Sequence, residues 1–173
     1  MSTTVAPVPT FRHPWYGIRT RSNRERIAAT VLKDRGFEPF LPVYRVRRRW
    51  SDRVVTTELP LFPGYVFCRF DHQLRLPVIS APGVVSIVAF GDRPAVLPDE
   101  EIEAVRAIVD SGAAAEPAPF LREGQRIRIV HGPLKSLEGT LVHKRSAWRL
   151  VVSVEMLQRS VSVEVDPCHI EAL

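Results

Sequence analysis

The sequence predicts an α+β protein in two units, an N-terminal mixed α/β sandwich with an antiparallel sheet and a small C-terminal β-barrel, joined by a flexible linker. Apolar residues recur at helical spacing after Ser22 and after Asp99, and strand-like β-branched or aromatic runs lie between these segments. Four short strand-like runs separated by turn residues fill the last third, which is typical of a small barrel. The expected parts are a disordered tail at 1–14, the first unit at 15–110, the linker at 111–119 and the second unit at 120–173.

The first unit opens with a strand and a helix. Residues Trp15–Thr20 are expected to form the strand, and Ser22 followed three positions later by Glu25 is the pattern of a capping box that begins a helix. The helix ends near Gly36, which suits a left-handed cap. The next segment, Phe37–Val46, contains two prolines, so it is restricted to an edge strand or an extended arm.

A dense basic cluster at Arg45–Arg53 is expected to form the tip of a hairpin, because Val54–Leu59 returns as a strand. Residues 1–53 hold 12 Lys and Arg against 4 Asp and Glu, so the positive charge is an N-terminal property. Arginines beside an exposed tryptophan can hold a nucleic-acid backbone and stack on a base, whereas the alternative is a solvated, mobile loop. The candidate nucleic-acid contacts of this cluster are Arg47, Arg48, Arg49 and Trp50.

The stretch Leu61–Phe70 is the centre of the first unit. Pro63 and Gly64 form a corner that leads directly into a strand of β-branched and aromatic residues. Alternation places Tyr65, Phe67 and Arg69 on one face and Val66, Cys68 and Phe70 on the other. Both faces are largely apolar, so the second face is either buried by the chain itself or docks a partner.

A further strand is expected at Val84–Phe90, before the second helix. That helix begins with Asp99, Glu100 and Glu101, whose charge suits the helix dipole. We interpret these carboxylates as a helix start rather than a metal site, because consecutive side chains diverge around a helix. The four strands of the second unit are expected at 125–130, 139–143, 149–154 and 160–165.

Several classes of protein are disfavoured by the sequence. The apolar runs are shorter than a membrane span and the first residues do not resemble a signal peptide, so we expect a cytoplasmic protein without a membrane partner. Cys68 and Cys168 form no CxxC pair, so neither a disulfide framework nor a zinc site is indicated. The chain lacks a P-loop, G-x-S-x-G and HExxH, so we expect no enzymatic activity and no cofactor.

Two sets of motifs resemble those of the NusG family of transcription elongation factors. In the first unit they are Trp15-Tyr16, Leu61–Tyr65, Gly83-Val84 and Pro94, in that order. In the second unit they are those of a KOW module, namely Gly124, Ile127–Val130, Gly132-Pro133-Leu134 and Glu138–Val142. The resemblance covers nearly all of the chain and implies an NGN domain, a linker and an SH3-like KOW barrel in a monomeric protein.

The resemblance implies that the NGN domain binds the clamp helices of the largest RNA polymerase subunit through an apolar depression of its sheet. By position, Tyr65, Phe67 and Ile87 match that depression. Arg19, Arg21 and Arg24 match the place where specialised members contact the non-template DNA strand. A solvated helix start is the alternative for these three arginines.

The resemblance also implies a second partner for the KOW domain, either the termination factor Rho or a ribosomal protein. Leu134 and Leu137 lie at the matching turn positions, which are often aromatic in the housekeeping factor. Gly132 and Gly139 bracket a tight turn and are expected to be structural. The valines of the second unit favour stable strands, so we expect a barrel at rest rather than a helical hairpin.

The function implied is a transcription elongation and antitermination factor that suppresses pausing or termination and recruits a second factor through its KOW domain. The segment Arg47–Arg53, which includes Trp50–Arg53, and the segment Leu61–Phe67 look more like the specialised antiterminator paralogues. The alternatives are a general housekeeping elongation or termination factor and a KOW-type ribosomal RNA-binding protein, in which the first unit has no place.

Overall fold

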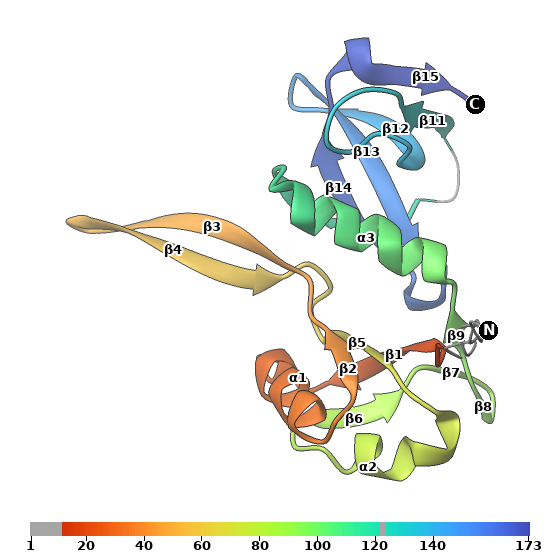
Figure 1. Ribbon diagram of the computed structural model, residues 1–173. Coiled ribbons are helices and arrows are strands. Elements are labelled where there is room, and N and C mark those ends of the chain that lie inside the picture. Colours follow the sequence, from red (N-terminus) through yellow and green to blue (C-terminus); the bar gives the residue numbers. More distant parts are fainter. Residues whose placement is uncertain (1–11, 122–123) are drawn as a thin grey trace, which may run out of the picture.

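The computed structural model describes residues 12–121 and 124–173. Most of the tail expected at 1–14 therefore lies outside the described residues. Figure 1 shows a lower lobe built on a small sheet, an upper lobe of strands, a long helix between them and a two-stranded arm that projects sideways.

The sheet of the lower lobe is antiparallel and has the strand order β2-β5-β1-β6, with β9 also paired to β1. The central pair is β1 and β5, and both strands were expected from the sequence. β2 lies at an edge, which agrees with the proline between Glu38 and Phe40. The strands are β1 Trp15–Thr20, β2 Glu38–Phe40, β5 Tyr65–Arg69, β6 Val84–Ile87 and β9 Val96–Leu97.

Helices cover both faces of this sheet. The predicted helices are α1 Glu25–Asp34 and α3 Asp99–Ser111. The structure adds two that the sequence did not indicate, the 3-10 turn η1 His72–Leu74 and the short helix α2 Arg75–Ile79. One face packs its apolar residues with Leu32 of α1 and Val78 of α2, and the other packs with the buried stripe of α3. The sheet is therefore buried on both sides.

The predicted capping box at the start of α1 is not formed. The N-cap is Arg24 and no side chain caps it. Glu25 instead turns into the protein, where its Oε1 accepts a hydrogen bond of 2.9 Å from the backbone N–H of Gly64. A long-range partner has replaced the local one, because Glu25 is buried beside the central corner.

Two hairpins extend from the lower lobe. The larger is the arm, made of β3 Val43–Trp50 and β4 Arg53–Pro60. It confirms the hairpin expected from the basic cluster, and its turn lies at Ser51 and Asp52. The smaller one pairs β7 Ala89–Phe90 with β8 Arg93–Pro94.

The upper lobe is a six-stranded antiparallel barrel-like sheet with the order β10-β14-β13-β12-β11-β15. All four predicted strands are present within a few residues of their expected bounds, so a strand-rich second unit is confirmed. Its core is formed by the inward residues Leu150, Val152, Val161 and Val163. Its elements are β11 Gln125–Ile129, β12 Glu138–Lys144, β13 Ala147–Val154, η2 Glu155–Leu157, β14 Arg159–Glu164, η3 Pro167–His169 and β15 Ile170–Ala172.

The linker expected at 111–119 is partly a strand. α3 ends at Gly112, whose φ of 69° gives the left-handed cap. β10 Ala115–Ala118 then pairs with β14, so these residues belong to the barrel sheet. The composition resembles a linker because Ala, Glu and Pro have weak strand propensity, and the pairing with β14 overrides it.

Candidate functional site

The corner before β5 is fixed from three directions. Gly64 has a φ of 84°, a conformation that glycine tolerates, and its carbonyl accepts a 2.8 Å hydrogen bond from the Thr20 backbone N–H. Its own N–H is bonded to Glu25. The Tyr65 N–H is bonded to the carbonyl of Phe62. The start of β5 is thereby tied to the end of β1 and to α1.

One face of the central strands carries Tyr65 and Phe67, two of the three predicted docking residues. Gly17 pairs with Phe67 and Arg19 pairs with Tyr65, and directly opposed residues of antiparallel strands share a face. We call this surface, with Trp15 at its end, the Phe67 face. Phe67 itself is fully buried, with its ring 5.2 Å from that of Phe62 and 6.1 Å from that of Phe40. Tyr65 is only partly buried.

Ile87 does not belong to the Phe67 face. It pairs with Ile18 and packs with the opposite core, beside α1 and α2. Its neighbour Val88 takes the expected place, because its N–H bonds to the carbonyl of Gly17 and its side chain lies against that glycine. The prediction was one residue out of register, and a shift of one residue moves a side chain to the other face.

The Phe67 face is covered by the upper lobe and by α3. Leu157 of η2 is almost fully buried, and its Cδ2 lies 2.9 Å from the position that a Cβ on Gly17 would occupy. The missing side chain at Gly17 thus makes room for a leucine of the barrel. The depression predicted to receive a partner is filled from within the chain.

Leu134 and Leu137, the predicted contacts of the second unit, are also covered. Both are buried and line a cleft of about 710 Å3 between the barrel and α3. On the helix side, the lining includes Ala104 and Ala107, whose small side chains allow the barrel to approach. Figure 1 shows α3 between the sheet of the lower lobe and the strands of the upper lobe, and the helix contacts β13 of the barrel.

An acidic contact joins the two lobes. The backbone N–H of Glu155 in η2 donates to Glu101 Oε1 of α3 at 3.5 Å. Burial raises the pKa of the Glu101 carboxyl, and the nearby charges of Glu155 and Glu100 raise it further, against the lowering effect of the hydrogen bond. The Glu101 Oε2 atom is buried without a hydrogen-bond partner among the described residues. The ionised form of Glu101 is therefore poorly accommodated when the lobes meet.

Two arginines lie close to the ring of Trp15. The guanidinium of Arg69 lies 4.6 Å from the centre of its ring, and that of Arg106 on α3 lies 5.8 Å away. Arg106 also lies over Phe40 at 4.6 Å. The two Arg106 contacts attach α3 to Trp15 of β1 and to Phe40 of the edge strand β2. Sequence reasoning missed them because the three residues lie far apart in the chain.

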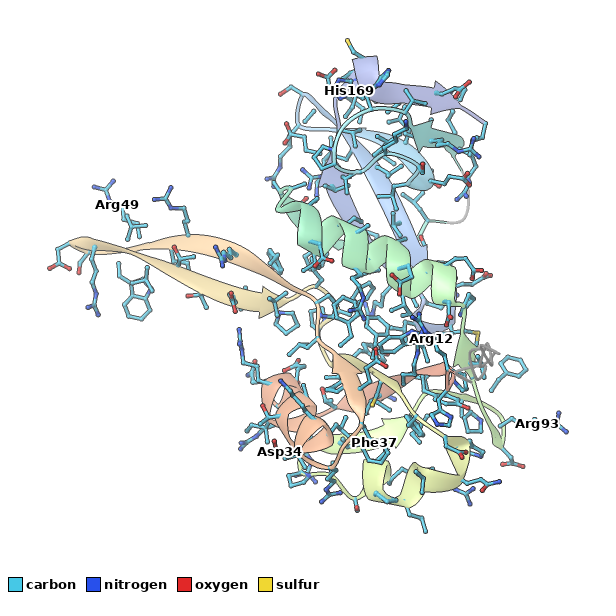
Figure 2. The ribbon with its side chains drawn as sticks, viewed as in Figure 1. Arg12, Asp34, Phe37, Arg49, Arg93 and His169 are labelled. Carbon is cyan, nitrogen blue, oxygen red and sulfur yellow. The ribbon has the colours of Figure 1, made fainter. Side chains whose placement is uncertain are left out.

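The predicted basic residues form two groups. Arg19, Arg21 and Arg24 are all exposed around the end of β1, and Arg19 lies directly beside Tyr65. The second group, on the arm, is also exposed and includes Trp50, which is 63% exposed. The groups lie on different elements, and Figure 2 shows Arg49 near the far end of the arm.

The described residues give little support for a metal site, a reactive thiol at Cys68 or a membrane-spanning helix. Within residues 12–121 and 124–173, no group of three or more His, Cys, Asp or Glu side chains is placed to hold a metal ion. Burial raises the pKa of the Cys68 thiol to about 12, which makes it unreactive. Among the described helices, none combines the length and the apolar character needed to cross a membrane.

Comparisons with known proteins agree on one family. A family model described as transcription termination factor nusG matches residues 13–106. The transcription termination/antitermination protein NusG of Thermus thermophilus is 27% identical over 175 residues, covering 88% of this chain and 94% of the relative. The protein of the same name from Borreliella burgdorferi is 28% identical, covering 92% of this chain and 98% of the relative.

A solved structure, entitled "Domain interaction in Thermotoga maritima NusG", has the same fold. It covers 92% of this chain and 97% of its own, with a TM-score of 0.56 and 20% identity. The shared architecture is a sheet-and-helix sandwich followed by a small strand-rich domain. The chain belongs to the NusG family of transcription termination factors.

Proposed function

We propose that this protein is an elongation and antitermination factor that binds RNA polymerase through the Phe67 face and suppresses pausing or termination. The observation that carries the proposal is that an apolar sheet face, with Tyr65 at its rim, is closed by the barrel rather than by its own domain alone. A face closed by a separable domain can be opened to a partner. In the proposed complex, the clamp helices of the largest polymerase subunit take the place of Leu157.

Arg19, Arg21 and Arg24 extend this proposal to DNA. They are exposed beside Tyr65 and have no ion pair with any residue that the structure describes. A polymerase bound at Tyr65 would bring its exposed non-template strand next to them. We assign these arginines to that strand, with contacts to its phosphates.

The barrel is proposed to recruit Rho or a ribosomal protein through Leu134 and Leu137. Both leucines are buried and line the cleft between the barrel and α3, so the proposed recruitment requires the lobes to separate. A single opening event would therefore expose both the polymerase surface and the second partner surface. The proposed setting is the cytoplasm of a bacterial cell, where transcription and translation meet.

The test is a titration of purified RNA polymerase elongation complexes with the wild-type protein, Tyr65→Ala and Tyr65→Phe. Loss of the exposed part of an aromatic anchor weakens an interface by about 1–2 kcal/mol, which is roughly tenfold in affinity. Tyr65→Phe keeps the ring and is expected to bind like the wild type. Equal binding by all three folded proteins would exclude the Phe67 face as the polymerase surface.

A further inference from the structure

The arm carries positive charge that the rest of the described chain does not neutralise. Arg45, near the base, lies 3.6 Å from Glu58, which also pairs with Arg26 at 2.9 Å. The arginines closer to the tip are exposed and form no ion pair with any side chain in the described ranges. These four are Arg47, Arg48, Arg49 and Arg53. Four like charges on one narrow ribbon repel each other, so an anionic partner would stabilise them.

The four arginines are divided between the two faces of the ribbon. Trp50 pairs directly with Arg53, and Arg48 lies two residues before Trp50, so these three side chains share one face. Arg47 and Arg49 alternate with them and occupy the other face. Figure 2 shows Arg49 standing out from the arm near its tip. Each face therefore offers two free guanidinium groups.

A partner for this arrangement needs negative charge on two sides. A single-stranded nucleic acid presents one backbone and engages one face at a time. A β-ribbon with its side chains is about 10 Å thick, which fits the roughly 12 Å major groove of B-form DNA but not its roughly 6 Å minor groove. In duplex RNA the major groove is too narrow and the wide groove is too shallow to enclose the ribbon.

We propose that the arm enters the major groove of a B-form DNA duplex with its tip first. Arg47 and Arg49 then contact phosphates of one strand, and Arg48 and Arg53 contact phosphates of the other. These contacts do not read bases, so binding is largely independent of sequence. The proposal goes beyond polymerase docking and does not depend on it, because the arm and the Phe67 face are separate surfaces.

The number of phosphate contacts predicts how steeply the association constant falls with salt concentration. Four contacts give a slope of about −3.6 for log K against log salt concentration, which is a loss of roughly a hundredfold for a fourfold rise in salt. The experiment measures fluorescence anisotropy of a labelled 24-base-pair DNA duplex, about two helical turns, with the full chain over a series of salt concentrations. Duplex RNA of the same sequence and each single DNA strand serve as competing ligands.

The variant R47A/R48A/R49A/R53A tests the whole arm. We expect it to bind the duplex at least roughly tenfold more weakly at low salt and to lose most of the salt slope. The matched control is K33A/R75A/R93A/R159A, which removes the same charge from exposed residues outside the arm. The control is expected to keep most of the affinity and the slope. Equal losses in the two variants would overturn the proposal, because only net charge would then matter.

Two paired variants test the groove. R47A/R49A and R48A/R53A are each expected to reduce the slope by about 2, since each removes two phosphate contacts. If only one pair matters, or if single strands or duplex RNA compete as well as duplex DNA, groove insertion is wrong. Tyr65→Ala is expected to leave duplex binding unchanged. Failure of the arm in this assay would therefore not be confused with failure of the polymerase proposal.

Discussion

Replacing Leu157 with alanine is the sharpest test of the contact between the two lobes. This side chain projects from η2 onto Gly17 and is 5% exposed. Truncating a buried leucine to alanine lowers the free energy of unfolding by about 2–5 kcal/mol. Leu157 lies at a turn between β13 and β14, so we assign about 2 kcal/mol to the contact that it makes between the lobes. The contact competes with polymerase for the Phe67 face.

The weaker contact between the lobes is expected to change the affinity for polymerase. If the closed arrangement dominates, the apparent dissociation constant is the intrinsic one divided by the open fraction. A loss of about 2 kcal/mol from the closed state raises the open fraction roughly thirtyfold and tightens polymerase binding by up to the same factor. The assay is a titration of elongation complexes with the full chain and Leu157→Ala.

The matched control is Leu76→Ala, which truncates a leucine that is 70% exposed on α2. It is expected to bind polymerase like the wild type. Unchanged affinity of a folded Leu157→Ala protein would refute the reasoning, because it would mean that Leu157 does not limit access to the Phe67 face. Weaker binding would refute it more strongly, since Leu157 would then help to bind polymerase.

Three further predictions follow from single residues. The raised pKa of Glu101 means that its charged form opposes the contact between the lobes. The contact should therefore strengthen as the pH falls from neutral through that pKa, and NMR can follow it. In Glu101→Gln, the contact between the lobes should be strong and independent of pH. Gly139→Ala places a Cβ 2.4 Å from the backbone oxygen of Val151 and should destabilise the barrel by about 1–3 kcal/mol in thermal unfolding, and an unchanged melting temperature would contradict the packing seen at Gly139. Alkylation read by mass spectrometry should modify exposed Cys168 in the folded protein and Cys68 only after unfolding, and early labelling of Cys68 would contradict its burial.

The local patterns of the sequence were sufficient for most elements of the fold. The alternation in β5 correctly placed Tyr65 and Phe67 on one face, because the strand period is a local property of the backbone. The stripe of α3 was recognised for the same reason, since its spacing depends only on the helix period. The hairpin at the basic cluster was predicted from two strand-like runs and the turn between them.

What the sequence did not reveal depends on pairings between distant residues. Ile87 was assigned to the wrong face because the register of β6 on β1 is set by tertiary contacts. The local pattern predicts a capping role for Glu25, whereas its partner in the structure, the N–H of Gly64, lies 39 residues away. The composition of Ala115–Ala118 predicts a linker, whereas the hydrogen bonds that make it a strand come from β14.

By itself, the sequence determined which residues of this protein share a strand face or a helix stripe, because those relations repeat over two to four residues. Only the tertiary structure decided that the apolar Phe67 face is closed by Leu157, and that Leu134 and Leu137 are buried at a cleft between the barrel and α3. The reason is that burial depends on which surfaces meet, and no local period records that. The arm combines the two cases, since strand alternation already divides Arg47, Arg48 and Arg49 between two faces, but placing Arg53 of β4 on the face of Arg48 required the register of β3 with β4.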